Sequence, residues 1–191
     1  DNWYFRLTVY DPFIMYNKFL SGVGLVKKDL FPLILIFLIV FSRLIPHPPN
    51  FTPIIAVAIM SGYLFKNLYL SISVLFFSMI VGDMFIGFYS NMFFVYFPLF
   101  IIAYFCFFKN NKINAKSLFI YGISSSLIFF IVSNFGVWLS GGMYEKNIAG
   151  LVNCYMMAIP FLKNTMISTI FFSYLSFISV NTFNKIANKT I

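Results

Sequence analysis

The 191-residue chain is 61% hydrophobic, and only 9% of its residues are charged. Soluble domains carry about 25% charged residues, so this composition excludes a chain that covers its surface in water with polar groups. Several apolar runs approach the roughly 20 residues that cross a bilayer as a helix. We therefore expect an integral membrane protein whose main surroundings are the lipid bilayer.

The formal net charge is +8, from 13 Lys and Arg against 5 Asp and Glu. On a soluble protein this excess would suggest a nucleic-acid partner. Here the lysines lie at the ends of apolar runs, where they orient helices in a membrane. We therefore expect no nucleic-acid partner and attribute the positive charge to membrane topology.

Residues 1–28 are predicted to form an amphipathic or interfacial arm. Pro12 and Gly22 interrupt this aromatic segment, so we do not expect it to form one spanning helix. Its tryptophan and tyrosines suit the headgroup zone of a membrane. A docking arm onto another protein is the open alternative. Because the chain begins with Asp1 rather than methionine, we expect a processed or partial product.

The apolar runs predict an all-α transmembrane domain of about six helices over residues 29–184, followed by a short basic tail at 185–191. The expected spans lie at about Leu30–Ile45, Ile54–Phe65, Leu68–Gly82, Asn91–Phe108, Leu118–Trp138 and Asn164–Phe183. A weakly polar stretch at 148–161 separates the last two spans. Whether it is helical or a re-entrant segment is left open.

Six spans place both termini on one side of the membrane. The lysines expected on that side are Lys27, Lys28, Lys66, Lys109, Lys112, Lys116, Lys185 and Lys189. The opposite side keeps only Arg43, Lys146 and Lys163. Because cytoplasmic loops carry an excess of Lys and Arg, both termini are predicted to be cytoplasmic, and the bacterial inner membrane is the expected location.

The same topology places the unusual polar residues on the extracytoplasmic side. The candidate ligand-binding residues are Arg43, His47, Asn50, Asp83, Asn134, Trp138, Lys163 and Asn164. An ionisable group at membrane depth is costly unless it pairs or meets water. Arg43 and Asp83 are therefore interpreted either as a structural ion pair or as the lining of a polar cavity that opens to the outside.

The only histidine lies in the stretch Phe41–Ile54, FSRLIPHPPNFTPI. Its prolines fix φ, remove backbone donors and push the preceding residues into extended geometry, so the connection is stiff. His47 and Asn50 are then held at defined angles, which lowers the ordering cost of binding a ligand. The alternative is a compact hairpin in which His47 bonds to a neighbouring carbonyl.

No catalytic motif is present in the sequence. It has no nucleophile elbow, no zinc-protease helix and no phosphate-binding glycine loop. One histidine is too few for a strong metal site or a haem pair. Cys106 and Cys154 match no metal or disulfide spacing, so we interpret them as packing residues. We expect no enzymatic activity, no metal and no cofactor.

Several motifs resemble an uncharacterised family of small bacterial integral membrane proteins. They include RLIPHPPNFTP at Arg43–Pro53, NFGVW at Asn134–Trp138 and SGGMY at Ser140–Tyr144, and the resemblance covers roughly residues 30–183. Tyr89 departs from the pattern, in which a histidine occupies this position. The size and layout are similar to the S components of energy-coupling-factor transporters. That resemblance implies vitamin binding from the outer face and association with a cytoplasmic ATPase module.

The first functional hypothesis is therefore a solute-binding protein of S-component type that takes a vitamin or another small molecule. Arg43 and Lys163 would favour an anionic group, Asn50 and Asn134 would bond to it, and Trp138 would stack on a ring. The 139–149 loop would close the pocket. Small residues of the second span and Ser124–Ser126 would face the coupling partner.

The second hypothesis is a non-catalytic accessory subunit of a larger membrane complex. The aromatic segment at 1–26, which a simple transporter does not need, would dock a neighbouring subunit. The proline-rich turn would be a rigid contact. A channel is a weaker third reading, because no ring of charges or filter-like repeat is visible.

Overall fold

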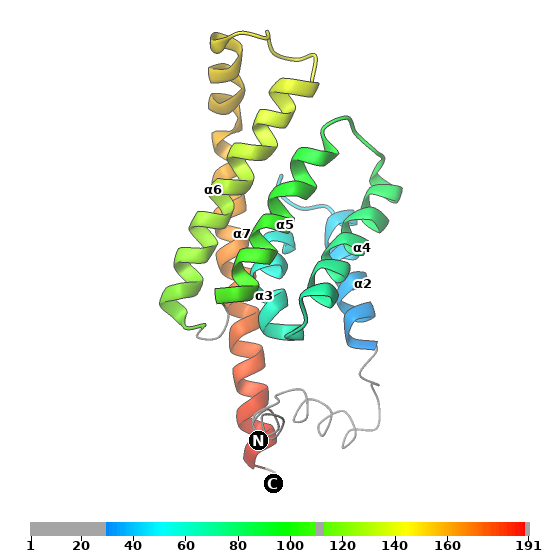
Figure 1. The fold of residues 1–191 in the computed structure, drawn as a ribbon, viewed down its shortest axis with the longest axis vertical. Coiled ribbons are helices and arrows are strands. Elements are labelled where there is room, and N and C mark those ends of the chain that lie inside the picture. The colour runs from blue at the N-terminus through cyan, green and yellow to red at the C-terminus, as the bar shows by residue number, and fades with distance from the viewer. Residues whose placement is uncertain (1–29, 110–112, 190–191) are drawn as a thin grey trace, which may run out of the picture.

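The computed structural model describes residues 30–109 and 113–189, and all of its regular structure there is helical (Figure 1). The helices are α2 (Leu30–Leu44), α3 (Ile54–Phe65), α4 (Leu68–Ile86), α5 (Met92–Lys109), α6 (Ala115–Ser140) and α7 (Ile148–Lys189). The predicted all-α fold is confirmed for these residues. The arm predicted at 1–28 lies outside them.

The helices α4, α5, α6 and α7 are long and apolar enough to cross a membrane. The shorter helices α2 and α3 are also apolar. The 12 residues of α3 extend over about 18 Å, less than the hydrocarbon core of about 30 Å. The structure therefore supports an integral membrane protein, while the count of six spans stays a prediction.

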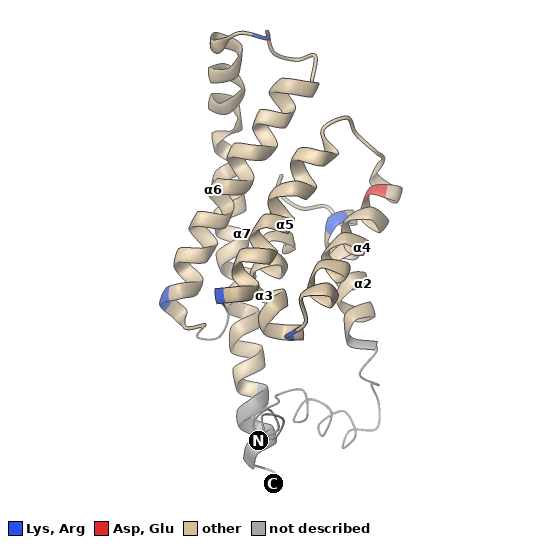
Figure 2. Ribbon diagram, viewed as in Figure 1, with Lys and Arg blue, Asp and Glu red and all other residues tan. Residues whose placement is uncertain are grey.

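Successive helices run in alternating directions (Figure 1). The connections 45–53, 87–91 and 141–147 lie toward one end of the bundle, here called the upper end. The start of α2 and the end of α7 lie toward the other, lower end. Figure 2 shows basic residues at the lower end, where α3 meets α4, α5 ends and α6 begins. Which end faces the cytoplasm remains a prediction.

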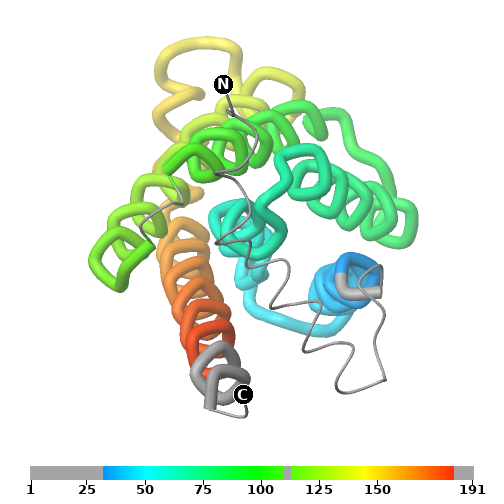
Figure 3. Tube along the Cα trace, turned by 60° about the horizontal axis from the view of Figure 1, so that its bottom comes forward, coloured from blue at the N-terminus to red at the C-terminus, as the bar shows by residue number. Residues whose placement is uncertain are grey.

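Helix α3 is the centre of the bundle, with α4, α5, α6 and α7 packed around it, whereas α2 lies at the edge beside α4 (Figure 3). Ala56, Ala58, Ser61 and Gly62 are all buried there. Small side chains allow backbones to approach closely. These residues serve packing within the chain, so they are not available as the partner-docking surface that the sequence suggested. Ser125 and Ser126 are likewise buried.

The weakly polar stretch 148–161 is helical and continuous with the last predicted span. Together they form α7, a single helix of 42 residues with Pro160 inside it. Its length of about 63 Å is roughly twice the hydrocarbon thickness, so α7 extends past the other helices (Figure 1). The re-entrant alternative for this stretch does not apply.

Helices α5 and α6 make a close contact at Gly136. This glycine is buried, and a Cβ added to it would overlap the Cβ and ring of Phe94 on α5. The ring of Phe94 also packs edge-on against Phe135, with centroids 5.9 Å apart. The contact brings the upper part of α6 against α5, beside the cavity described below.

Candidate functional site

A cavity of about 850 Å³ occupies the upper half of the bundle. Its lining comes from every described helix and from all three upper connections. Only Ile54 and Ile55, the first residues of α3, contribute from the central helix. Because α3 is short and begins partway down the bundle, the central space above it is left unfilled. The cavity is a consequence of that helix length.

The cavity brings together several of the residues singled out in the sequence. Arg43, His47, Asn50 and Asn134 line it. Its lining does not include Asp83, Trp138, Lys163 or Asn164. The wall between the polar groups is apolar, with side chains such as Met79, Leu99 and Phe129.

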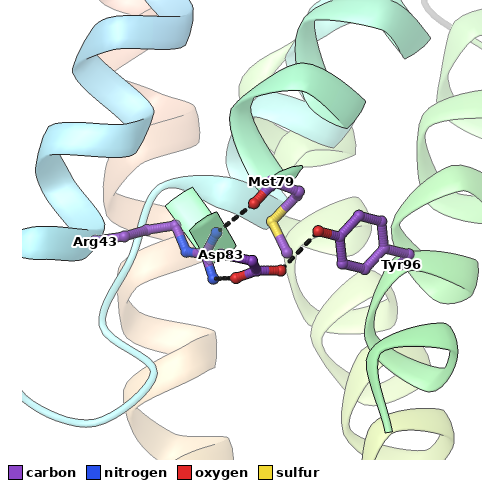
Figure 4. Close-up of polar contacts among 4 residues, drawn as sticks. All are labelled: Arg43, Met79, Asp83 and Tyr96. Carbon is purple, nitrogen blue, oxygen red and sulfur yellow. Dashed lines mark hydrogen bonds and ion pairs between the residues drawn. The ribbon is translucent and has the colours of Figure 1, made fainter. Parts of the chain in front are cut away.

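Arg43 and Asp83 form an ion pair that joins α2 to α4 (Figure 4). The other terminal nitrogen of Arg43 donates to the carbonyl oxygen of Met79 at 3.0 Å. Tyr96 on α5 donates to the second carboxylate oxygen of Asp83 at 2.6 Å. The Asp83 side chain is completely buried, whereas Arg43 is 10% exposed. The structural ion pair is therefore present, and Arg43 also lines the cavity.

Gly82 makes room for this network. A Cβ at position 82 would meet the guanidinium of Arg43. Because α2 lies at the edge of the bundle, the contacts of Arg43 with α4 hold its upper end in place. The network thus fixes one wall of the cavity.

The proline-rich connection forms a tight turn over residues 48–51. Phe51 N–H donates to the carbonyl oxygen of Pro48 at 2.9 Å, and Asn50 has a φ of 60°. A proline in the second position and a positive φ in the third are the pattern of a type II turn. His47 Nδ1 also contacts the Pro48 oxygen, at 2.8 Å. A carbonyl can only accept, so Nδ1 carries the hydrogen and the neutral ring keeps Nε2 as an acceptor.

One face of α7 anchors this turn. Asn164 Nδ2 donates to the carbonyl oxygen of Pro49 at 3.0 Å. The hydroxyl of Ser168 shares its one hydrogen between the carbonyl oxygen of Thr165, at 3.0 Å, and that of Asn50, at 3.5 Å. One turn further along, Phe172 packs its ring against the phenylalanine of the turn, with centroids 5.9 Å apart. Residues four apart lie on the same face of a helix. Asn164 thus positions the turn from outside the cavity.

Replacing Asn164 with leucine should loosen this anchor. The Pro49 carbonyl would lose its donor, which we expect to lower the free energy of unfolding by about 1–2 kcal/mol. We expect a fall of a few degrees in Tm in detergent. Asn153→Leu is the matched control, because Asn153 is exposed on the same helix and lies outside the cavity lining. Equal Tm values for the two variants would contradict the anchoring role.

The connection after α6 is held by Lys146. Its ammonium donates to the carbonyl oxygen of Trp138, to that of Leu139 at 2.9 Å and to that of Gly141 at 2.8 Å. The last carbonyls of a helix lack partners within it, and a cation there also opposes the negative end of the helix dipole. Lys146 therefore caps α6 and folds the connection back over it.

Trp138 belongs to the same arrangement. Its Nε1 donates to the carbonyl oxygen of Glu145 at 2.9 Å, and Lys146 lies 5.6 Å from the ring centroid. Met143 and Tyr144, in the connection that these contacts shape, line the cavity. Trp138 contributes to the site through that connection. Lys163 is an exposed residue of α7.

The model of a "Family of unknown function (DUF6580)" matches residues 25–189. The chain belongs to this family. Neither a curated protein nor a solved structure matches the chain. The matched range includes every described helix, so the cavity lies wholly within the DUF6580 region.

Further lining residues of the DUF6580 cavity were not among the predicted site residues. They are polar side chains of the helices and loops, namely Thr52, Tyr89, Asn91, Ser133, Tyr144, Cys154 and Thr165. Tyr89 had a signal in the sequence, because it departs from the family pattern. Ser133 had a weaker one, as a polar residue beside Asn134 in an apolar run. The lining role of Cys154 required the fold.

Tyr89 lies in the connection between α4 and α5. Burial, together with the negative charge of nearby Asp83, raises the pKa of Tyr89 to about 12, although Arg43 acts in the opposite direction. The phenol therefore keeps its proton at any pH near neutrality. It remains a hydrogen-bond donor in the cavity wall.

Arg43 alone carries a full charge among the described residues that line the cavity. Asp83 compensates this charge from outside the lining. No group of three or more His, Cys, Asp or Glu side chains comes together in the described part of the chain. The arrangement is suited to holding a molecule through its shape and a few hydrogen bonds.

Proposed function

We propose that this chain is a membrane-embedded solute-binding protein that takes a small molecule, such as a vitamin, into the upper cavity. The observation that carries the proposal is the cavity itself. Its volume of about 850 Å³ lies within the range of about 300–1,000 Å³ typical of small-molecule sites. Such sites combine mostly apolar walls with a few fixed polar groups, as this one does.

The fixed position of these polar groups supports the same proposal. The ion pair and the Met79 carbonyl hold Arg43, and the anchored turn holds His47 and Asn50. Groups that are already ordered lose little conformational entropy when a ligand binds.

The more specific proposal is an S component of an energy-coupling-factor transporter. The cavity would open on the extracytoplasmic side, because basic residues lie at the lower end, where α3 meets α4, α5 ends and α6 begins, against Lys146 in an upper connection (Figure 2). An ATPase module would bind from the cytoplasmic side and supply the energy. The chain itself would carry out no chemical reaction.

The test is purification from native membranes in mild detergent, followed by mass spectrometry of bound molecules. Val137→Trp places a large ring in the cavity lining, whereas Leu139→Trp adds the same ring at an exposed position outside it. We expect a stoichiometric small molecule with the wild type and with Leu139→Trp. We expect its loss from Val137→Trp, with gel filtration verifying that both variants are folded.

The proteins that accompany the chain distinguish the specific forms of the proposal. Co-purified ATPase subunits would support the S-component assignment. A fixed set of subunits from one large membrane complex, with no bound small molecule, would overturn solute binding. That result would favour the accessory-subunit hypothesis, whose proposed docking segment at 1–26 lies outside the described residues.

A further inference from the structure

Four side chains in the cavity wall direct their single donor hydrogen at a backbone carbonyl. They are His47 to Pro48 at 2.8 Å, Ser133 to Phe129 at 2.6 Å, Cys154 to Asn134 at 3.5 Å and Thr165 to Phe161 at 2.8 Å. All four donors line the cavity. They come from the proline turn, from α6 and from α7.

The chemistry of the carbonyl settles where each hydrogen is. A carbonyl oxygen only accepts, so the hydroxyl, the thiol and the Nδ1 nitrogen must be the donors. A hydroxyl that has donated its hydrogen still has lone pairs, and the neutral histidine keeps Nε2 as an acceptor. What these side chains can offer a molecule in the cavity is therefore acceptor capacity, strongest at His47, Ser133 and Thr165.

Arg43 and Tyr89, two of the donor groups in the lining, come from a different part of the bundle than Ser133 and Thr165. The guanidinium of Arg43 has five N–H groups, and Met79 and Asp83 accept from two of them. Tyr89 keeps its phenolic hydrogen. Arg43 ends α2 and Tyr89 follows α4, whereas α6 and α7 pair on the other side of the bundle (Figure 1). Ser133 and Thr165 therefore offer acceptors on the side of the cavity away from Arg43 and Tyr89, whereas His47 lies in the turn that follows α2.

This distribution disfavours charged molecules. Asp83 already balances the charge of Arg43, so an anion beside this arginine would have no counter-charge of its own, and its remaining oxygens would meet the lone pairs of Ser133 and Thr165. A cation would lie near Arg43 without a carboxylate in the cavity lining to balance it. Burying an unbalanced charge in apolar surroundings is costly.

We propose, on the basis of the solute-binding function above, that the cavity selects an uncharged molecule with an apolar body and N–H or O–H donors facing Ser133 and Thr165. An acceptor at the opposite end of this molecule would meet Arg43. The class differs from the anionic ligand that the sequence suggested, because Lys163 lies outside the lining and Asp83 compensates Arg43.

A set of three fragments tests the donor and the charge separately. Benzimidazole is a neutral ring with one N–H donor, 1-methylbenzimidazole lacks that donor, and benzimidazole-5-carboxylate adds a negative charge. Affinities are measured by calorimetry on the full chain in detergent, with Val137→Trp as the background for uptake by micelles. We expect benzimidazole to bind at least fivefold more tightly than either relative.

Ser133→Ala and Ser140→Ala are the matched variants. Both remove a serine of α6 whose hydroxyl bonds to the carbonyl four residues earlier, but only Ser133 lines the cavity. We expect Ser133→Ala to weaken benzimidazole binding about five- to tenfold, the effect of losing one neutral hydrogen bond. Ser140→Ala should leave the affinity unchanged.

The outcomes separate this proposal from the function on which it rests. Equal or tighter binding of the methylated or carboxylated fragment overturns the selectivity, as does benzimidazole binding no stronger than the Val137→Trp background. A co-purified molecule that is lost in Val137→Trp but is ionic or lacks donors overturns the selectivity alone. If no co-purified molecule depends on residue 137, solute binding by the cavity fails as well.

Discussion

Asp83→Ala is expected to lower the free energy of unfolding by about 3–5 kcal/mol. The change removes a completely buried carboxylate and leaves the guanidinium of Arg43 without its counter-charge. It also removes the acceptor of the Tyr96 hydroxyl. Equilibrium unfolding in detergent, or the fall in Tm, measures the effect.

The double variant Arg43→Met with Asp83→Leu is the informative comparison. Replacing both members of a buried ion pair with apolar side chains is often close to neutral, because no unpaired charge remains. We therefore expect the double variant to be far more stable than Asp83→Ala. If the two lose the same stability, the cost comes from packing at these positions and the ion pair is not its source.

Gly136→Ala is expected to lower the free energy of unfolding by about 1–3 kcal/mol. The added methyl group would overlap the Cβ of Phe94, an atom attached directly to the backbone of α5. A flexible side-chain end could rotate away, but this atom moves only if the helix moves. Helices α5 and α6 would separate, and the cavity that both help to line would change shape.

Gly142→Ala provides the control for this prediction. Gly142 is exposed in the connection after α6, and an added Cβ would meet no atom within 4 Å. We expect its Tm to stay within about a degree of the wild-type value, as for most exposed substitutions. A Tm for Gly136→Ala as high as that of Gly142→Ala would mean that α5 and α6 are not in close contact at this point.

The boundaries of a helix are predictable from the sequence where the residues directly before and after it determine where it starts and stops. Helix α3 begins at Ile54 and ends at Phe65, as predicted, because Pro53 precedes it and Lys66 adopts a left-handed conformation after it. Helix α4 was predicted to end at Gly82 but continues to Ile86. The charge of Asp83 was interpreted as the end of a span, but pairing with Arg43 allows that residue to be buried inside the helix.

The candidate site was predictable only in part. The sequence identified His47 and Asn50 because proline chemistry is local, and it recognised Arg43 because an arginine at the end of an apolar run needs a partner or water. It assigned Trp138 and Asn164 to ligand binding on their proximity to other polar residues. Their bonds to Glu145 and Pro49 depend on how α6 and α7 meet the loops.

The sequence by itself determined that this is a helical membrane protein, since hydrophobicity and charge act residue by residue. The isolated polar and charged residues at the ends of apolar runs also indicated which connections would hold the candidate site residues. Only the tertiary structure decided that α3 is buried at the centre, that a cavity lies above it and that Asp83 is sealed from it. These features depend on which helices pack together, because burial and hydrogen-bond partners come from residues distant in the chain.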